Sequence, residues 1–194
     1  MNRFTAMGQS LDILSGKPGS KPDFSTFTMD RYESITIYKT SYYSFALPIR
    51  AAMLLTGITD PLVHQEAQEI LLKMGHFFQV QDDFLDCFGD PEKTGKVGTD
   101  IEEGKCCWPF VKALQLANIE ERKTLEDNYG LKDEKAVAQV KKIYKKLDLV
   151  GEYEKYEKET FEELKKCTEK TCESTKLPPK IFLYLLGSIF KRQS

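Results

Sequence analysis

The sequence contains only two histidines, His64 and His76, and its five cysteines include no C-x-x-C pair. Without that spacing, and with the histidines distant from most of the cysteines, the sequence shows no zinc-binding pattern. The odd number of cysteines also gives no basis for a disulfide framework, so we expect reduced thiols of an intracellular protein with structural roles. These thiols belong to Cys87, Cys106, Cys107, Cys167 and Cys172.

Long hydrophobic runs are also lacking, since the longest apolar stretch covers only residues 181–190. That length is too short to cross a bilayer, and the first ten residues contain no apolar run typical of a signal peptide. Lys+Arg 28 nearly balances Asp+Glu 30, and a net charge of −2 argues against the broad basic surface that binds nucleic acid. We expect a soluble cytoplasmic protein, with an organellar form as the alternative.

Apolar residues recur at helical spacing over most of the chain, and no segment shows the alternation of a strand. A chain of 194 residues with 41% hydrophobic content can bury one core, so we expect a single all-α domain over residues 1–194. A loop is predicted over the glycine-rich residues 88–105. Helices are predicted over residues 4–14, from Thr28 or Asp30 through Tyr42, over 51–55, 61–87, 108–116, 135–147 and 153–172, and after Pro179.

Two of these helices have marked features. The helix that begins at Pro61, with Asp60 as its N-cap, is apolar over much of its surface and is predicted to lie at the centre of a bundle. Pro48 is expected to interrupt the helix before it, because proline has no amide donor. Residues 132–176 are dense in lysine and glutamate, which indicates a solvated helix face with i,i+4 pairs. We assign no chemistry to that face.

The central helix ends in an acidic cluster, Asp82-Asp83-Phe84-Leu85-Asp86, with aromatic neighbours. Asp82 and Asp86 project from one helix face, with Asp83 beside them. Like charges at this spacing are unfavourable, and partial burial makes them more so. No lysine or arginine lies within one turn, so a bound cation is the simplest compensation. An acidic helix end that faces water is the competing interpretation, because such short patterns recur by chance.

The kind of cation follows from the ligand atoms, which are all oxygens. Carboxylates without a nearby imidazole or thiolate suit Mg²⁺, with Mn²⁺ as the alternative. Mg²⁺ usually shares its coordination shell with substrate phosphates. The segment Thr94-Gly95-Lys96-Val97-Gly98-Thr99-Asp100, followed by Gly104 and Lys105, adds another carboxylate and two lysines between glycines. Such a loop after an aspartate-rich helix end is predicted to clamp a diphosphate.

The acidic cluster and the loop after it resemble those of a known family. The segments 77–91 (FFQVQDDFLDCFGDP) and 94–101 (TGKVGTDI) resemble the second aspartate-rich region of eukaryotic farnesyl diphosphate synthases. The similarity spans nearly the whole chain, and its further matches are 8–12 (GQSLD), 38–48 (YKTSYYSFALP), 128–130 (NYG), 147–149 (LDL), 177–179 (LPP) and 190–192 (FKR). The resemblance implies an isoprenoid-synthase-type helical bundle, usually a homodimer, that condenses allylic and isopentenyl diphosphates with Mg²⁺.

The resemblance also implies roles for matching residues. Asp82, Asp83, Asp86 and Asp100 would form the metal site, in which Asp82 would ligate the metal directly and Asp86 and Asp100 would act directly or through water. Lys39 and Lys96 would hold the allylic diphosphate, while oxygens of Thr40 and Gln79 would stabilise a developing carbocation. The implied substrate-binding residues are Gln9, Asp12, Tyr43, Phe78, Lys105 and the basic end Lys191 and Arg192.

One departure from the family is large. Residues 1–20 supply neither the first aspartate-rich motif, nor the arginine pair behind it, nor the residues that set product length. We therefore expect a domain that is incomplete at its N-terminus. Two alternatives to a farnesyl diphosphate-forming prenyltransferase stay open: a non-catalytic diphosphate-binding or partner subunit, and a terpene cyclase. The intact Lys39-Thr40 pair and the 95–100 loop argue mildly against the cyclase.

Overall fold

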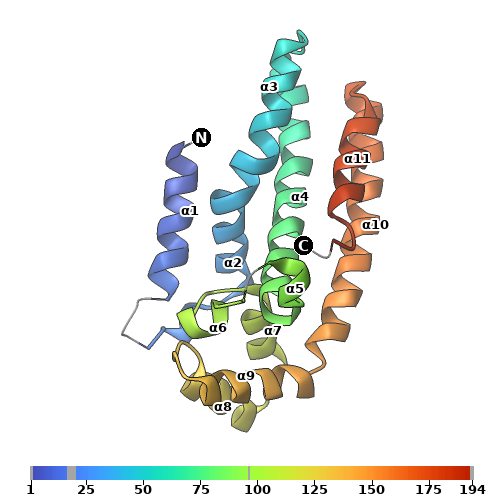
Figure 1. Cartoon of the computed structure of the whole chain (residues 1–194). Helices are drawn as coiled ribbons and strands as arrows, with labels where there is room; N and C mark the ends of the chain where they lie inside the picture. Colours follow the sequence, from blue (N-terminus) through green and yellow to red (C-terminus); the bar gives the residue numbers. More distant parts are fainter. Residues whose placement is uncertain (1, 17–20, 96, 193–194) are drawn as a thin grey trace.

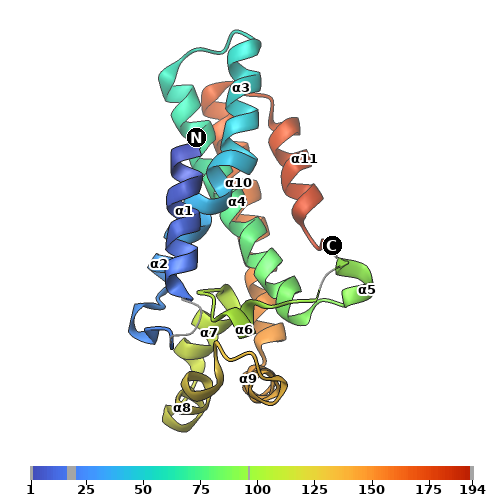
Figure 2. The same ribbon diagram turned by 60° about the vertical axis from the view of Figure 1, so that its left-hand side comes forward.

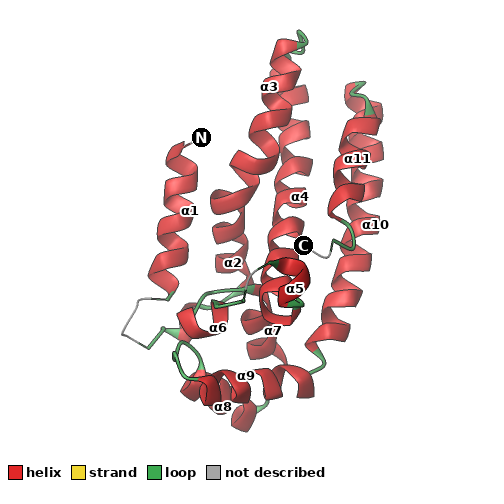
Figure 3. Ribbon diagram, viewed as in Figure 1, coloured by secondary structure: helices red, strands yellow, loops and turns green. Residues whose placement is uncertain are grey.

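The computed structural model describes residues 2–16, 21–95 and 97–192. Over these ranges the chain consists of helices and their connections, without a strand (Figure 3). The all-α class predicted from the sequence is therefore confirmed. No helix in the described ranges has both the length and the apolar character needed to span a membrane. All five cysteines are free thiols, as expected.

The elements follow one another with short connections. In chain order they are α1 Asn2–Ser15, the 3-10 helix η1 Phe24–Thr26, α2 Met29–Thr36, the π-helical segment η2 Ile37–Ala46, α3 Leu47–Leu55, α4 Pro61–Phe88, α5 Pro91–Thr94, α6 Asp100–Glu103, α7 Trp108–Leu116, α8 Ile119–Asn128, α9 Glu134–Lys146, α10 Leu149–Thr175 and α11 Pro179–Ile189.

Helix α4 lies at the centre of the bundle, with α2, η2 and α3 along one side and α10 with α11 along the other (Figure 1). Its buried residues contribute to two apolar clusters. One cluster joins the lower half of α4 to α2, α7, α8, α9 and the start of α10, and the other joins its upper half to η2, α3, α10 and α11. The central position that the sequence predicts for this helix is thus confirmed.

Local side-chain chemistry fixes where the long helices begin. The Asp60 carboxylate accepts a hydrogen bond from the amide of Leu62, and Pro61 is the first residue of α4, as predicted. Of the two proposed caps for α2, Thr28 is the one used, because its side chain accepts from the amide of Arg31. Asp30 instead lies in the first turn, where a negative charge is favourable.

The helix before Pro48 widens into π-helix over Ile37–Ala46. Proline cannot continue regular α-helical hydrogen bonding and clashes with the preceding turn, so the predicted interruption takes this form. Helix α1 packs along η2, and Figure 2 shows the two side by side. A Cβ on Gly8 would lie 2.1 Å from the backbone nitrogen of Lys39, so only glycine permits this approach.

Two predictions of secondary structure were wrong. Residues 88–105 are not simply a loop, because they contain the short helices α5 and α6, each ended by a glycine with positive φ, Gly95 and Gly104. Helix α8 was not predicted at all. It begins with a capping box in which Asn118 and Glu121 exchange side-chain-to-backbone hydrogen bonds.

Candidate metal and diphosphate site

The acidic cluster lies in the last turns of α4, beside a crevice of about 70 Å³. This volume accommodates ions and phosphate oxygens but not an isoprenoid chain. Residues from six segments line it, and eight of the thirteen were predicted from the sequence as site residues. The thirteen are Asp12, Tyr32, Ile35, Thr36, Lys39, Gln79, Asp82, Asp83, Asp86, Asp100, Lys105, Cys106 and Cys107.

The loop after α4 folds back against the helix end and brings Asp100 to the cluster. The amide of Asp100 donates to Oδ2 of Asp86 at 3.1 Å. Gly98 makes this return possible, because a Cβ there would lie 1.7 Å from the carbonyl oxygen of Asp86. The glycine therefore serves a close backbone approach, as the sequence pattern indicates.

The crevice concentrates negative charge. Burial raises the pKa of Asp100 above its ordinary value, and the neighbouring carboxylates of Asp83 and Asp86 add to the shift. Burial also raises the pKa of Asp83, and hydrogen bonds to its carboxylate partly offset that rise. Carboxylates that resist ionisation for these reasons gain from a bound cation.

Two lysines that also line the crevice balance part of this charge. Nζ of Lys39 and Nζ of Lys105 lie 2.9 Å and 3.0 Å from the same oxygen, Oδ2 of the buried Asp12. Burial lowers the pKa of Lys39, but the Asp12 carboxylate outweighs it and the net pKa is raised, so the ammonium stays charged. The two cations are thus held together by one carboxylate, 93 residues from Lys105 in the sequence.

The donor set fits Mg²⁺ in a particular way. Among the described residues, no three acidic, histidine or cysteine side chains converge closely enough to hold one ion by themselves. Mg²⁺ needs no such cage, because it retains waters and is usually bound through one or two carboxylates together with substrate phosphates. The ligand atoms at the crevice are carboxylate oxygens, the type that Mg²⁺ prefers.

A buried hydrogen-bonded chain connects η2 to α4. Oγ1 of Thr40 donates to Oε1 of Gln79 at 2.6 Å, and Nε2 of Gln79 donates to Asp83 at 2.9 Å and to Asp82 at 3.3 Å. The other oxygen of Asp83 accepts from the amide of Trp108 at 3.0 Å. Asp83 is therefore hydrogen-bonded to Gln79 and to the start of α7 and is buried, while Asp82, Asp86 and Asp100 are partly exposed.

The other predicted site residues do not all lie at the crevice. Gln9 is exposed on α1 and does not line the crevice, and Tyr43 on η2 is 49% exposed. Lys96 lies outside the described residues. Arg192 reaches the cluster from the end of the chain, with its guanidinium 3.7 Å from Oδ1 of Asp82 and 4.1 Å from the ring centroid of Phe78. The Lys191 ammonium instead lies over the Phe190 ring.

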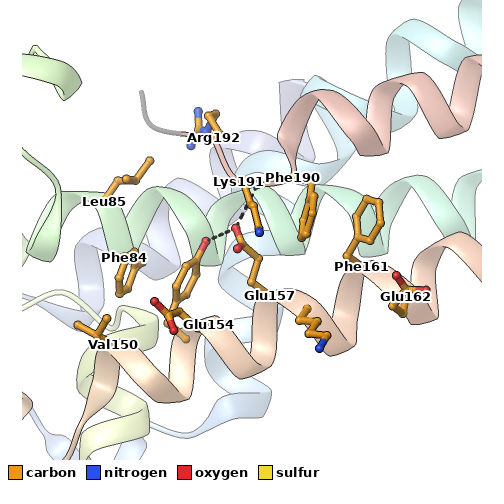
Figure 4. Close-up of a pocket in the computed structure, with 12 residues that line it drawn as sticks. Phe84, Leu85, Val150, Glu154, Glu157, Phe161, Glu162, Phe190, Lys191 and Arg192 are labelled. Atoms are coloured by element: carbon orange, nitrogen blue, oxygen red, sulfur yellow. Dashed lines mark hydrogen bonds between the residues drawn. The ribbon is translucent and has the colours of Figure 1, made fainter.

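The sequence reading missed a buried glutamate. Most acidic residues of α10 are solvated, as predicted, but Glu157 is buried and hydrogen-bonded to Gln81, Tyr153 and the backbone of Lys191. It borders a cavity of about 760 Å³ between α4, α10 and the chain end, which Figure 4 shows. The signal was present, since Tyr153, Glu157 and Leu164 fall on one helix face.

Comparisons with known proteins identify the family of the chain. The family model of polyprenyl synthetases matches residues 2–147. The chain is 48% identical over 189 residues to the farnesyl pyrophosphate synthase of Gallus gallus, covering 97% of the chain and 51% of that protein. For the enzyme of Rattus norvegicus the identity is 49%, with 97% and 53% covered.

Solved structures show the same fold. The T. brucei farnesyl diphosphate synthase complexed with risedronate superimposes with a TM-score of 0.90 at 35% identity, covering all of this chain and 57% of that one. The chain thus spans about half the length of the relatives that it matches. On the family match and these identities, the chain belongs to the polyprenyl synthetase family.

Proposed function

We propose that this chain acts in a Mg²⁺-dependent prenyltransferase that condenses dimethylallyl or geranyl diphosphate with isopentenyl diphosphate to give farnesyl diphosphate. The observation that carries the proposal is one crevice lined both by Asp82, Asp86 and Asp100 and by two lysines that share the Asp12 carboxylate. Metal-bridged carboxylates and paired ammonium groups are what a diphosphate leaving group requires.

In this proposal Asp82, Asp86 and Asp100, with Asp83 beside them, would hold the metal, and a metal held there would supply positive charge to the diphosphate. Lys39 and Lys105 donate to the diphosphate oxygens, and Lys96 is assigned the same role on the resemblance alone. The family chemistry breaks the C–O bond of the allylic substrate, and the double bond of isopentenyl diphosphate then attacks the cation. The released diphosphate accepts the proton that is lost.

Thr40 and Gln79 are assigned to the allylic cation. Their mutual hydrogen bond fixes both side-chain oxygens in a buried position next to the acidic cluster. Oxygen dipoles that are already oriented stabilise positive charge without further reorganisation. Phe78 and Tyr43 are assigned to the prenyl and isopentenyl side, Gln9 to the pocket of the allylic diphosphate, and Lys191 and Arg192 to a substrate diphosphate. On the family resemblance we also infer a cytoplasmic homodimer.

A second candidate follows from the span of the chain, which is about half that of its relatives. It is a non-catalytic subunit that binds a diphosphate but does not ionise substrate. To separate the two, the purified chain is incubated with geranyl and isopentenyl diphosphates and Mg²⁺, and prenyl products are measured. Farnesyl diphosphate formation that is lost in Asp82→Ala supports the enzyme. Mg²⁺-dependent diphosphate binding without turnover supports the subunit. If the chain shows neither turnover nor diphosphate binding, both candidate functions are contradicted.

A further inference from the structure

The end of the chain is held by a buried carboxylate on α10. Oε1 of Glu157 accepts three hydrogen bonds, from Nε2 of Gln81 at 3.0 Å, from the hydroxyl of Tyr153 at 3.0 Å and from the backbone amide of Lys191 at 3.2 Å. Figure 4 shows Glu157 pointing from α10 toward Lys191. Only 8% of Glu157 is exposed, although its neighbours Glu154 and Lys158 are exposed. A charge in this position requires such donors.

The backbone of Lys191 is in an unfavourable conformation. Its φ of 54° lies in the left-handed region, which is unfavourable for a residue with a Cβ. The hydrogen bond from the Lys191 amide to a buried carboxylate offsets that cost, because bonds to charged acceptors are the stronger kind. Glu157 therefore fixes the direction in which the chain leaves α11.

The side chain of Gln81 transmits the same constraint to Arg192. A carboxylate can only accept, so the amide nitrogen of Gln81 faces Glu157 and its oxygen faces away. That oxygen accepts from Nε of Arg192 at 3.2 Å. Gln81 is 1% exposed, so its orientation has no solvent-facing alternative. Glu157 thus determines both the backbone of Lys191 and the side chain of Arg192.

The guanidinium of Arg192 lies at the edge of the acidic cluster and has one buried N–H donor that is not used within the described residues. It lies 3.7 Å from Oδ1 of Asp82, which is an ion-pair distance but too long for a hydrogen bond, and it stacks on Phe78. Its Nη2 is buried and makes no hydrogen bond to any of the described residues. A buried donor of this kind is suited to an anion bound beside Asp82.

We propose that Glu157 is a positioning residue that aims Arg192 at a diphosphate bound next to Asp82. It acts through two routes, the Lys191 amide and the Gln81 side chain, and does not touch the ligand itself. This inference rests on the proposed function for the identity of the anion, but the fixed position of the chain end does not depend on it.

The test compares Glu157→Gln with Glu154→Gln in the whole chain. Both substitutions remove one negative charge from the same helix, but only the first removes the carboxylate that holds Lys191. Amide hydrogen exchange reports on the chain end, and calorimetric titration with inorganic diphosphate and Mg²⁺ reports on the anion site. Unchanged thermal unfolding and circular dichroism establish that each variant is folded.

We expect Glu157→Gln to accelerate exchange of the Lys191 amide about tenfold or more, since a hydrogen bond to a charged group is lost. It should also weaken diphosphate binding about tenfold, and Arg192→Gln should cause a similar loss. The double variant should bind no more weakly than Arg192→Gln alone, because both act through one guanidinium. Glu154→Gln should match the wild type in both measurements.

Exchange in Glu157→Gln equal to that in Glu154→Gln would overturn the inference. Losses of diphosphate affinity that add up in the double variant of Glu157 and Arg192 would also overturn it. A loss of stability in Glu157→Gln without faster exchange of the Lys191 amide would do the same. If the wild-type chain binds no diphosphate, the proposed function fails. The exchange experiment still decides in that case whether Glu157 holds the chain end.

Discussion

Replacing Gly98 by alanine tests whether the return of the loop onto α4 builds the site. The added Cβ would lie 1.7 Å from the carbonyl oxygen of Asp86 and 2.7 Å from its Oδ2. Ordinary contact requires about 3.4 Å or more, so the segment must move away by well over 1 Å. The hydrogen bond from the Asp100 amide to Asp86, now 3.1 Å, cannot survive that shift.

The size of the effect follows from that bond. A hydrogen bond to a charged group contributes about 1.5–3 kcal/mol, which corresponds to about a tenfold to hundredfold change in an equilibrium constant. We expect Gly98→Ala to weaken Mg²⁺-dependent binding of inorganic diphosphate by that factor. The assay is isothermal titration calorimetry at fixed Mg²⁺, with thermal unfolding measured in parallel.

Gly95→Ala is the matched control in the same loop. A Cβ at Gly95 meets nothing within 4 Å, although its φ of 71° makes alanine somewhat strained. This variant should therefore keep wild-type affinity while losing about 1 kcal/mol of local stability. Affinity of Gly98→Ala within twofold of the wild type, or an equal loss in Gly95→Ala, would refute the role given to the close approach.

Two further predictions concern stability. Burial lowers the pKa of His76 from 6.5 to about 4, so the unfolded chain takes up a proton more readily and stability falls as pH drops below 6.5. Between pH 7.5 and 5 this loss is about 2 kcal/mol, and urea unfolding of His76→Gln should lack it; identical pH slopes in both proteins would contradict the effect. Asp12→Asn leaves Lys39 and Lys105 without their shared carboxylate and should lower the free energy of unfolding by about 2 kcal/mol. Asp127→Asn, which breaks an exposed pair, should change it by less than about 0.5 kcal/mol, and equal effects of the two would count against the buried network.

Features set by neighbouring residues could be predicted from the sequence. The start of α4 follows from Asp60 and Pro61, because a cap and a proline act within one turn. Asp82 and Asp86 share a face for the same local reason. Helix α8 was missed because it has few apolar residues, although the spacing of Asn118 and Glu121 signals its start.

Features that depend on tertiary packing could not be predicted. The two lysines meet at Asp12 only because α1, η2 and the segment after α6 come together in space. In the same way, Glu157 looks like its solvated neighbours in sequence, and only the packing of α10 against α4 and the chain end buries it. Composition predicts the average character of a charged helix and not the exception on its inner face.

The central claim is that this crevice binds a diphosphate through a divalent metal. Titration of the whole chain with inorganic diphosphate, with and without Mg²⁺, tests it most directly, with Asp82→Asn as the variant. We expect binding that requires Mg²⁺ and that weakens at least about tenfold in Asp82→Asn, as loss of a metal ligand would cause. Binding that is equally strong without Mg²⁺ or in Asp82→Asn, or no binding at all, would contradict the account.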